Sequence, residues 1–173
     1  MGFDLQPILK GKLVELRPLQ PDDFDRLFEV ARDPLIWEQH PASDRYKEEV
    51  FREFFRVGLE SGGAFLVTDA SDGAVIGSTR YFGYNEEESE IEIGWTFLAR
   101  SHWGGRYNGE MKDLMLQHAF RFVDRVVFLI GPQNLRSRRA VEKLGATQIA
   151  NRLDANGREV VAYQLSRQTF KDL

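Results

Sequence analysis

Cysteine is absent from this chain of 173 residues. Without cysteine there is no disulfide, no thiolate nucleophile and no thiolate ligand for a metal ion. Histidine is scarce too, and the three histidines, His40, His102 and His118, lie far apart in the sequence. Because no two of them have the helical spacing of a zinc-binding pair, we predict that the protein holds no metal.

Long apolar runs and an excess of basic charge are also missing. No stretch approaches the roughly 20 apolar residues that cross a bilayer. Residues 1–10 lack the basic start and apolar middle of a secretory signal. The net charge of -4 argues against general nucleic-acid binding, which needs a basic field. We therefore expect a cytoplasmic protein that binds neither membranes nor nucleic acid.

What the chain does contain is typical of a globular protein, with 42% hydrophobic and 29% charged residues. Its length predicts a single domain over residues 1–173, with the core at about 12–166. Apolar periodicity and turn signals predict strand, two helices, three strands, helix, strand, helix and two strands. The predicted ranges are 12–17, 21–32, 47–59, 64–69, 74–84, 90–97, 107–123, 125–131, 135–144, 147–153 and 159–165.

This order describes an α/β (α+β) fold with a central mixed, mostly antiparallel sheet of about seven strands and about four flanking helices. The one crossover runs from strand 90–97 through helix 107–123 to strand 125–131, so those two strands are expected to pair in parallel. Within the first of them, alternation predicts two sides. Ile91, Ile93 and Trp95 fall on one side, and Glu90, Glu92, Gly94 and Thr96 on the other.

The most informative segment is Trp103-Gly104-Gly105-Arg106-Tyr107-Asn108-Gly109, between a predicted strand and a predicted helix. Glycine lets the backbone turn tightly and lets N–H groups approach a ligand. The helix start adds free N–H donors and a positive dipole end, which suit a phosphate. A glycine turn that merely permits close packing explains the segment equally well. A P-loop is excluded because Glu110-Met111-Lys112 follows the last glycine.

Two further segments resemble a known family. Gly131 to Ser137 (GPQNLRS) and Glu142 to Ala146 (EKLGA), together with the glycine turn and the element order, are similar to the GCN5-related N-acetyltransferases, the GNAT family. The ribosomal-protein-alanine acetyltransferase (RimJ/RimL-like) branch is the most similar. The resemblance covers residues 13–165. It implies a single-domain GNAT-like fold with a splayed parallel strand pair and acetyl-CoA as co-substrate.

The resemblance also implies cofactor-binding residues. The main chain around Phe97 and Leu98 would pair with the pantetheine arm, and an N–H near Phe97 would stabilise the oxyanion. In the family's acetyl-CoA turn, Trp103 takes the first position, while Arg106 and Asn108 replace small residues. We expect the Arg106 side chain to point away from the phosphates or to contact one. The residues assigned to the cofactor are Phe97, Leu98, Trp103, Gly104, Gly105, Arg106, Tyr107, Asn108, Gly109, Asn134 and Ser137.

Several of these residues have a second interpretation. Asn134 could instead be a helix N-cap, with Ser137 an exposed small residue of that helix. His102 flanks the turn and is interpreted as a surface loop residue rather than a base. Arg136, Arg138 and Arg139 are interpreted as a solvated helix face or a contact to the 3′-phosphate of coenzyme A.

The predicted catalytic residues are Glu92 and Ser137. An amine acceptor arrives protonated, and Glu92 is the candidate base, acting directly or through a water. Glu90 is the alternative, since alternation places both carboxylates on one face, and Glu92 could also be an ordinary paired sheet residue. Ser137 would protonate the leaving thiolate. Because cysteine is absent, direct transfer in a ternary complex is predicted.

The predicted function is transfer of an acetyl group from acetyl-CoA to a primary amine, with a protein N-terminal α-amino group as one candidate. Small-molecule amines (an amino sugar, polyamine, amino acid or antibiotic) are an alternative, as is a non-catalytic acyl-CoA-binding module. The acceptor would approach the aromatic connection 35–46 and the first two helices. Trp37, Tyr46, Phe51, Phe54, Tyr81 and Tyr84 are candidate walls. The resemblance also allows a homodimer.

Overall fold

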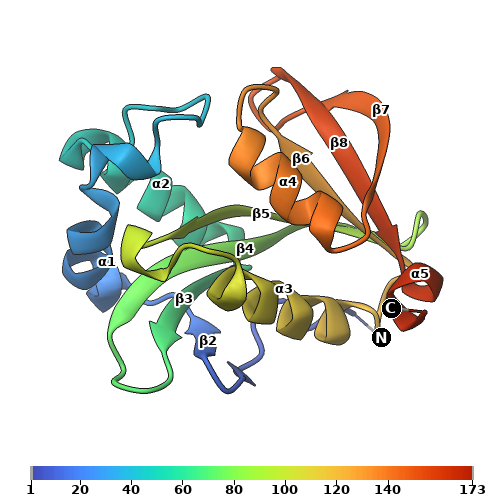
Figure 1. The fold of residues 1–173 in the computed structure, drawn as a ribbon, viewed down its shortest axis with the longest axis horizontal. Coiled ribbons are helices and arrows are strands. Elements are labelled where there is room, and N and C mark those ends of the chain that lie inside the picture. Colours follow the sequence, from blue (N-terminus) through green and yellow to red (C-terminus); the bar gives the residue numbers. More distant parts are fainter. Residues whose placement is uncertain (1, 173) are drawn as a thin grey trace.

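One mixed sheet organises the molecule (Figure 1), in a computed structural model that describes residues 2–172. Its eight strands lie in the order β1-β2-β3-β4-β5-β6-β8-β7. The prediction of about seven missed only β1, two residues paired with β2. The strands are β1 (Leu9–Lys10), β2 (Val14–Pro18), β3 (Ala64–Asp69), β4 (Val75–Asn85), β5 (Glu90–Leu98), β6 (Arg125–Ile130), β7 (Thr147–Leu153) and β8 (Glu159–Ser166).

The helices cover both faces of the sheet. They are α1 (Phe24–Ala31), α2 (Glu48–Ser61), α3 (Arg106–Ala119), α4 (Leu135–Lys143) and a short α5 (Arg167–Lys171). The four longer ones confirm the prediction of about four. The first predicted helix begins as a 3-10 turn at Pro21–Asp23, and the predicted 107–123 helix ends earlier, at Ala119.

Two apolar clusters fill the space between sheet and helices. On one face α1 and α2 bury Leu27, Phe51 and Phe55 against the sheet. On the other face α3 and α4 bury Met111, Met115 and Val141. This two-faced burial is what an almost continuous apolar strand such as β6 requires. Among residues 2–172, no helix has both the length and the apolar character needed to cross a bilayer.

The parallel pair β5–β6 separates along its length. The strands pair only from Glu90 with Arg125 to Glu92 with Val127. Beyond these pairs β5 continues to Leu98 and β6 to Ile130 without further pairing to each other. The splayed parallel pair is thus confirmed, and the gap leaves main-chain groups of both strands unpaired by the sheet.

A β-bulge in β5 changes which side of the sheet the residues after it face, compared with the prediction. Ser78 pairs with Phe97 and Arg80 with Gly94, so β5 has one extra residue, and Trp95 has a φ of 53°. The bulge turns Trp95 toward Arg80 on the α2 face, while Thr96 bonds to Lys112 of α3 on the opposite face. The prediction that Thr96 shares a face with Glu92, and Trp95 with Ile93, is therefore wrong.

Glu110 of α3 fastens the helix to the first long strand. Its Oε1 accepts hydrogen bonds from the N–H of Leu13 at 2.7 Å and of Val14 at 3.0 Å. Glu110→Ala leaves both donors without this acceptor, which is expected to lower the free energy of unfolding by about 1–3 kcal/mol. Urea denaturation measures this. Asp113→Ala, at an exposed position of the same helix, is the control. Equal stability of the two variants would contradict the fastening role.

Candidate active site

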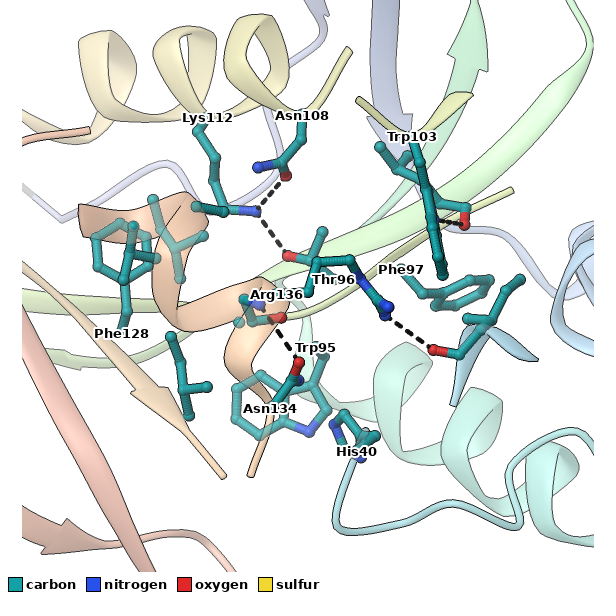
Figure 2. A pocket seen from close by; sticks show the side chains of 18 of the residues that line it. His40, Trp95, Thr96, Phe97, Trp103, Asn108, Lys112, Phe128, Asn134 and Arg136 are labelled. Carbon is teal, nitrogen blue, oxygen red and sulfur yellow. Dashed lines mark hydrogen bonds between the residues drawn. The ribbon is translucent and has the colours of Figure 1, made fainter. Parts of the chain in front are cut away.

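A cavity of about 210 Å³ lies at the gap between β5 and β6 (Figure 2). Eight of the eleven residues predicted to bind the cofactor line it: Phe97, Leu98, Trp103, Gly104, Gly105, Asn108, Asn134 and Ser137. Arg106, Tyr107 and Gly109 do not, and neither does Glu92, which lines a neighbouring hollow with Arg152 and Asp154. The fold therefore brings together two sequence segments that are about 30 residues apart.

The glycine turn borders this cavity and leads into main-chain N–H groups that the helix leaves free. Gly104 and Gly105 have φ values of 116° and 100°, which side-chain-bearing residues rarely adopt. The N–H of Gly109 makes a helical bond to the oxygen of Gly105, so the three preceding N–H groups of α3 have no intrahelical acceptor. Arg106, the first residue of α3, is exposed and in a helical position that needs no glycine. The turn therefore keeps glycine where the backbone demands it.

The main chain of Leu98 faces the gap. The N–H of Ala99 bonds to Ile76 of β4, and hydrogen-bonded pairs alternate along an antiparallel ladder. The main-chain N–H and C=O of Phe97 thus point toward β4, and those of Leu98 point away from it. The Leu98 oxygen accepts a hydrogen bond from Trp103 Nε1 at 2.9 Å, which fits this direction. Its N–H is the main-chain donor that faces the gap.

On the α4 wall, Asn134 caps the helix and also lines the cavity. Its Oδ1 accepts a hydrogen bond from the N–H of Ser137 at 3.3 Å, as an N-cap does. The side chain is also buried and lines the cavity together with Ser137. None of the hydrogen bonds among residues 2–172 uses Asn134 Nδ2. This amide group is therefore available to a ligand while the oxygen caps the helix.

The loops at the mouth are held by charged side chains. The Arg136 guanidinium lies 3.8 Å from the centre of the Trp103 ring, and it also donates to the oxygen of Ile36. Arg136 is thus not part of a solvated helix face. His102 does not stand free in a surface loop either: its Nε2 is 2.8 Å from Asp69 Oδ2, and its ring packs on Tyr107.

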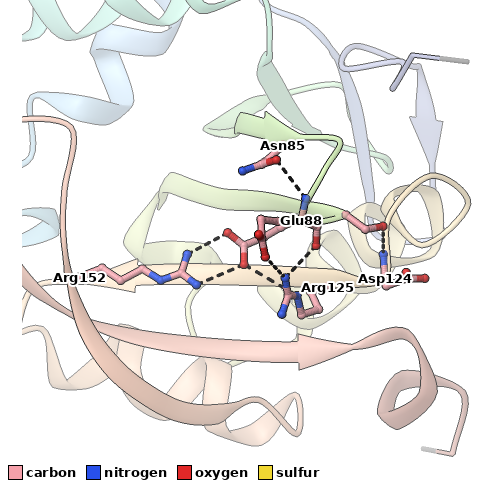
Figure 3. Close-up of polar contacts among 7 residues, drawn as sticks. Asn85, Glu88, Asp124, Arg125 and Arg152 are labelled. Carbon is pink, nitrogen blue, oxygen red and sulfur yellow. Dashed lines mark hydrogen bonds and ion pairs between the residues drawn. The ribbon is translucent and has the colours of Figure 1, made fainter.

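Glu90 and Glu92 have very different surroundings. Glu90 receives two hydrogen bonds from Arg152, at 2.8 and 3.2 Å, and lies 4.0 Å from Arg125. In Figure 3 these two arginines approach from opposite directions. Glu92 has no hydrogen bond or ion pair among the described residues. Burial raises the pKa of its carboxyl to about 7, against an opposing effect of Arg80. Glu92 therefore has the properties of a base near neutral pH.

Glu92 leans toward the gap. Its Oε2 lies 3.2 Å from where a Cβ on Gly94 would be, and Gly94 lines the cavity. A side chain at position 94 would therefore crowd the end of the Glu92 side chain on the α2 face. Arg80, paired with Gly94, lies on that face too. It is 2% exposed, stacks on Trp95, and donates no side-chain hydrogen bond among the described residues.

The sequence interpretation missed Lys112. This residue of α3 lines the cavity, is 4% exposed, and donates to Thr96 Oγ1 at 2.9 Å and Asn108 Oδ1 at 3.3 Å. One signal was available: Lys112 follows Asn108 by four residues and precedes Met115 and Leu116, so it falls on the buried side of the helix. Of the predicted acceptor walls, Trp37 lines the cavity, while Phe51 and Tyr81 are fully buried core residues.

A parallel pair that opens into a gap, with a glycine turn at its mouth, suits a long, thin ligand with an anionic end. The class is that of the acetyltransferases, since the acetyltransferase (GNAT) domain family matches residues 14–147. The chain belongs to the GNAT family, and it is an acetyl-CoA-dependent N-acetyltransferase. No curated protein is similar enough to this chain to count as a match.

Solved structures share the fold over nearly the whole chain. A probable GNAT-family acetyltransferase from Chromobacterium violaceum has a TM-score of 0.85 at 20% identity, covering 98% of this chain and 91% of that one. A GCN5-related N-acetyltransferase from Brucella melitensis has a TM-score of 0.79 at 20% identity, covering 96% and 81%. Mycobacterium smegmatis RimJ in complex with CoA-disulfide has a TM-score of 0.69 at 17% identity, covering 94% and 87%.

Proposed function

We propose that this acetyltransferase acts on an α-amino group, such as that of a peptide or protein N-terminus, by direct attack in a ternary complex. The observation that carries this proposal is the unpaired, half-buried carboxylate of Glu92 beside the gap, where desolvation raises its pKa to about 7. An α-amino group has a pKa of about 7.7–8.0, whereas a lysine side chain has about 10.4. A base with a pKa near 7 can deprotonate an α-ammonium group at a small cost in free energy, but a lysine ammonium group only at a large cost.

Each residue of the site has a defined task. Main-chain N–H groups from Gly104 to Asn108 bind the diphosphate of acetyl-CoA, and Asn134 donates to the pantetheine arm. The N–H of Leu98 donates to the thioester carbonyl oxygen, whose negative charge grows during attack. Glu92 accepts the proton that the amine loses, directly or through a water, and Ser137 donates a hydrogen bond to the departing sulfur.

A small amine that carries an anionic group is a second candidate acceptor. The Arg80 guanidinium supports it, being buried on the Glu92 face without a carboxylate in hydrogen-bond contact. A buried unpaired cation is costly, and an anionic substituent on the acceptor would compensate for it. Arg45 adds a second guanidinium nearby, stacked on Phe54 and Trp37.

An acceptor survey with acetyl-CoA separates these candidates. Purified protein is assayed for free thiol release with peptides that have free or blocked N-termini, and with small amines that are neutral or anionic. We expect turnover with free peptide N-termini and none with blocked ones. Turnover confined to anionic small amines would favour the second candidate. Binding of acetyl-CoA by calorimetry without turnover on any amine would contradict both.

A further inference from the structure

Lys112 is a buried cation without a counter-ion. Its ammonium group has two neutral acceptors, Thr96 Oγ1 and Asn108 Oδ1, and no ion pair to a carboxylate among the described residues. In Figure 2 the side chain descends from α3 toward Thr96 at the cavity. An ammonium group has three N–H donors, so one remains for a ligand in the cavity. Burying a charge in this way is costly unless a ligand compensates for it.

Lys112 lies beside a part of the gap that is farther from the glycine turn than Leu98 is. An arm anchored at Gly104 and Gly105 passes Leu98 first and reaches Thr96 two residues later, about 7 Å further along β5. Thr96 bonds to Lys112, and Gly94 and Ile93 close the cavity beyond it. The part of acetyl-CoA that lies farthest from the diphosphate is its thioester. Lys112 therefore lies on the α3 face of the gap, while Glu92 lies on the α2 face with its carboxylate next to Gly94.

We propose that Lys112 is a catalytic residue that donates its remaining N–H to the thioester sulfur and stabilises the thiolate as it departs. This inference rests on the proposed function of the site. The amine then enters from the α2 face, beside Glu92, and the sulfur leaves toward the α3 face, beside Lys112. Ser137, on the α4 wall, supplies a neutral donor, while Lys112 supplies positive charge.

The proposed step balances as follows. The amine first gives its ammonium proton to solvent through Glu92. The neutral nitrogen then forms a bond to the acetyl carbon and loses one further proton to Glu92. The carbon–sulfur bond breaks, and sulfur keeps the electron pair as a thiolate hydrogen-bonded to Lys112. Proton transfer from the ammonium group gives the free thiol and neutral Lys112. Glu92 returns its proton to solvent and Lys112 takes one up, so the net products are the acetylated amine and coenzyme A.

The acidity of Lys112 suits this task. Burial alone lowers its pKa to about 7 from the ordinary value of 10.5. Proton transfer from such an ammonium to a thiolate, whose thiol pKa is about 8.5, is therefore favourable. The other titratable or charged side chains that line the cavity are His40, His102 and Arg136, and none of them pairs with Lys112. Burial keeps His40 neutral by lowering its pKa to about 3.

Lys112→Met tests the proposal by kinetics. We expect kcat to fall about 10- to 100-fold while the KM for acetyl-CoA stays within about threefold, because the lost donor acts on developing charge. The ratio of wild-type to variant rates should also fall as pH rises through about 7, where Lys112 loses its proton. Lys112→Gln serves if the methionine variant does not fold. Unchanged kcat, or a raised KM with unchanged kcat, would overturn the proposal.

A binding measurement decides the matter even if no amine is turned over. Coenzyme A is bound to saturation, and the ultraviolet absorbance of its thiolate is followed with pH. We expect the bound thiol to ionise at lower pH in the wild type than in Lys112→Met. Equal ionisation in both overturns the role of Lys112 and leaves the proposed function standing if the wild type is active. If the bound thiol ionises at lower pH in the wild type but no amine is turned over, the role of Lys112 stands and the proposed function is contradicted.

Discussion

Replacing Glu92 with glutamine is expected to lower kcat by about 100- to 10,000-fold, the range for loss of a general base. Glutamine keeps the shape of the side chain and removes the proton acceptor. In the wild type, kcat/KM should rise with pH up to about 7, because only the ionised Glu92 can accept the proton, and the loss of the Lys112 proton limits the increase above that pH. In Glu92→Gln the increase below pH 7 should disappear and leave only the dependence that comes from the amine and Lys112. The pH–rate profiles of both proteins measure it.

Glu90→Gln is the matched control on the same strand. Glu90 is engaged by Arg152, and its negative charge helps to raise the pKa of Glu92. The increase in rate should therefore persist in Glu90→Gln and move to lower pH. If Glu90→Gln abolishes the increase and Glu92→Gln keeps it, the assignment of the base is wrong.

Thermal denaturation shows whether Glu92→Gln is intact. The folded-state pKa of Glu92 lies above its unfolded value of 4.5, so its contribution to stability is fully present below pH 4.5 and is lost as pH rises through about 7. A neutral glutamine avoids this loss. The variant should therefore melt at the same temperature as the wild type or higher at pH 8, which separates a catalytic defect from misfolding.

Gly105→Val is expected to weaken acetyl-CoA binding by about 10- to 100-fold. Gly105 has a φ of 100° and precedes the free N–H groups of α3. Valine can adopt this backbone conformation only at a cost of about 1–3 kcal/mol. The turn should therefore relax to another conformation and misalign the N–H donors. Isothermal calorimetry with acetyl-CoA measures the change in affinity.

Gly73→Val is the control for this substitution. Gly73, in the turn between β3 and β4, has a φ of 74° and open space around its Cβ position. Valine at position 73 should introduce a similar backbone strain, but this position does not line the cavity. The affinity of Gly73→Val for acetyl-CoA should equal that of the wild type, although the stability of the variant falls. Equal affinities of Gly105→Val and the wild type would contradict the role of the turn.

How far the sequence predicts this protein can be followed residue by residue. The range of β3 was predicted without error, and the C-terminal hairpin differs by a single residue at the end of β8. Strand alternation failed within β5 because the bulge at Trp95 is a relation between two strands. Local periodicity contains no information on how many residues of β4 oppose a stretch of β5.

The candidate site, too, was predicted in part from the sequence and in part revealed only by the tertiary structure. The sequence alone determined the element order, the family resemblance, the glycine turn and the Asn134–Ser137 segment, because these depend on local backbone preferences and short motifs. Only the tertiary structure distinguishes the surroundings of Glu90 from those of Glu92, since Arg152 reaches Glu90 from 62 residues away in the chain. It alone also revealed Lys112 beside Thr96. The acidity of both Glu92 and Lys112 is set by burial, which exists only once distant segments have packed together.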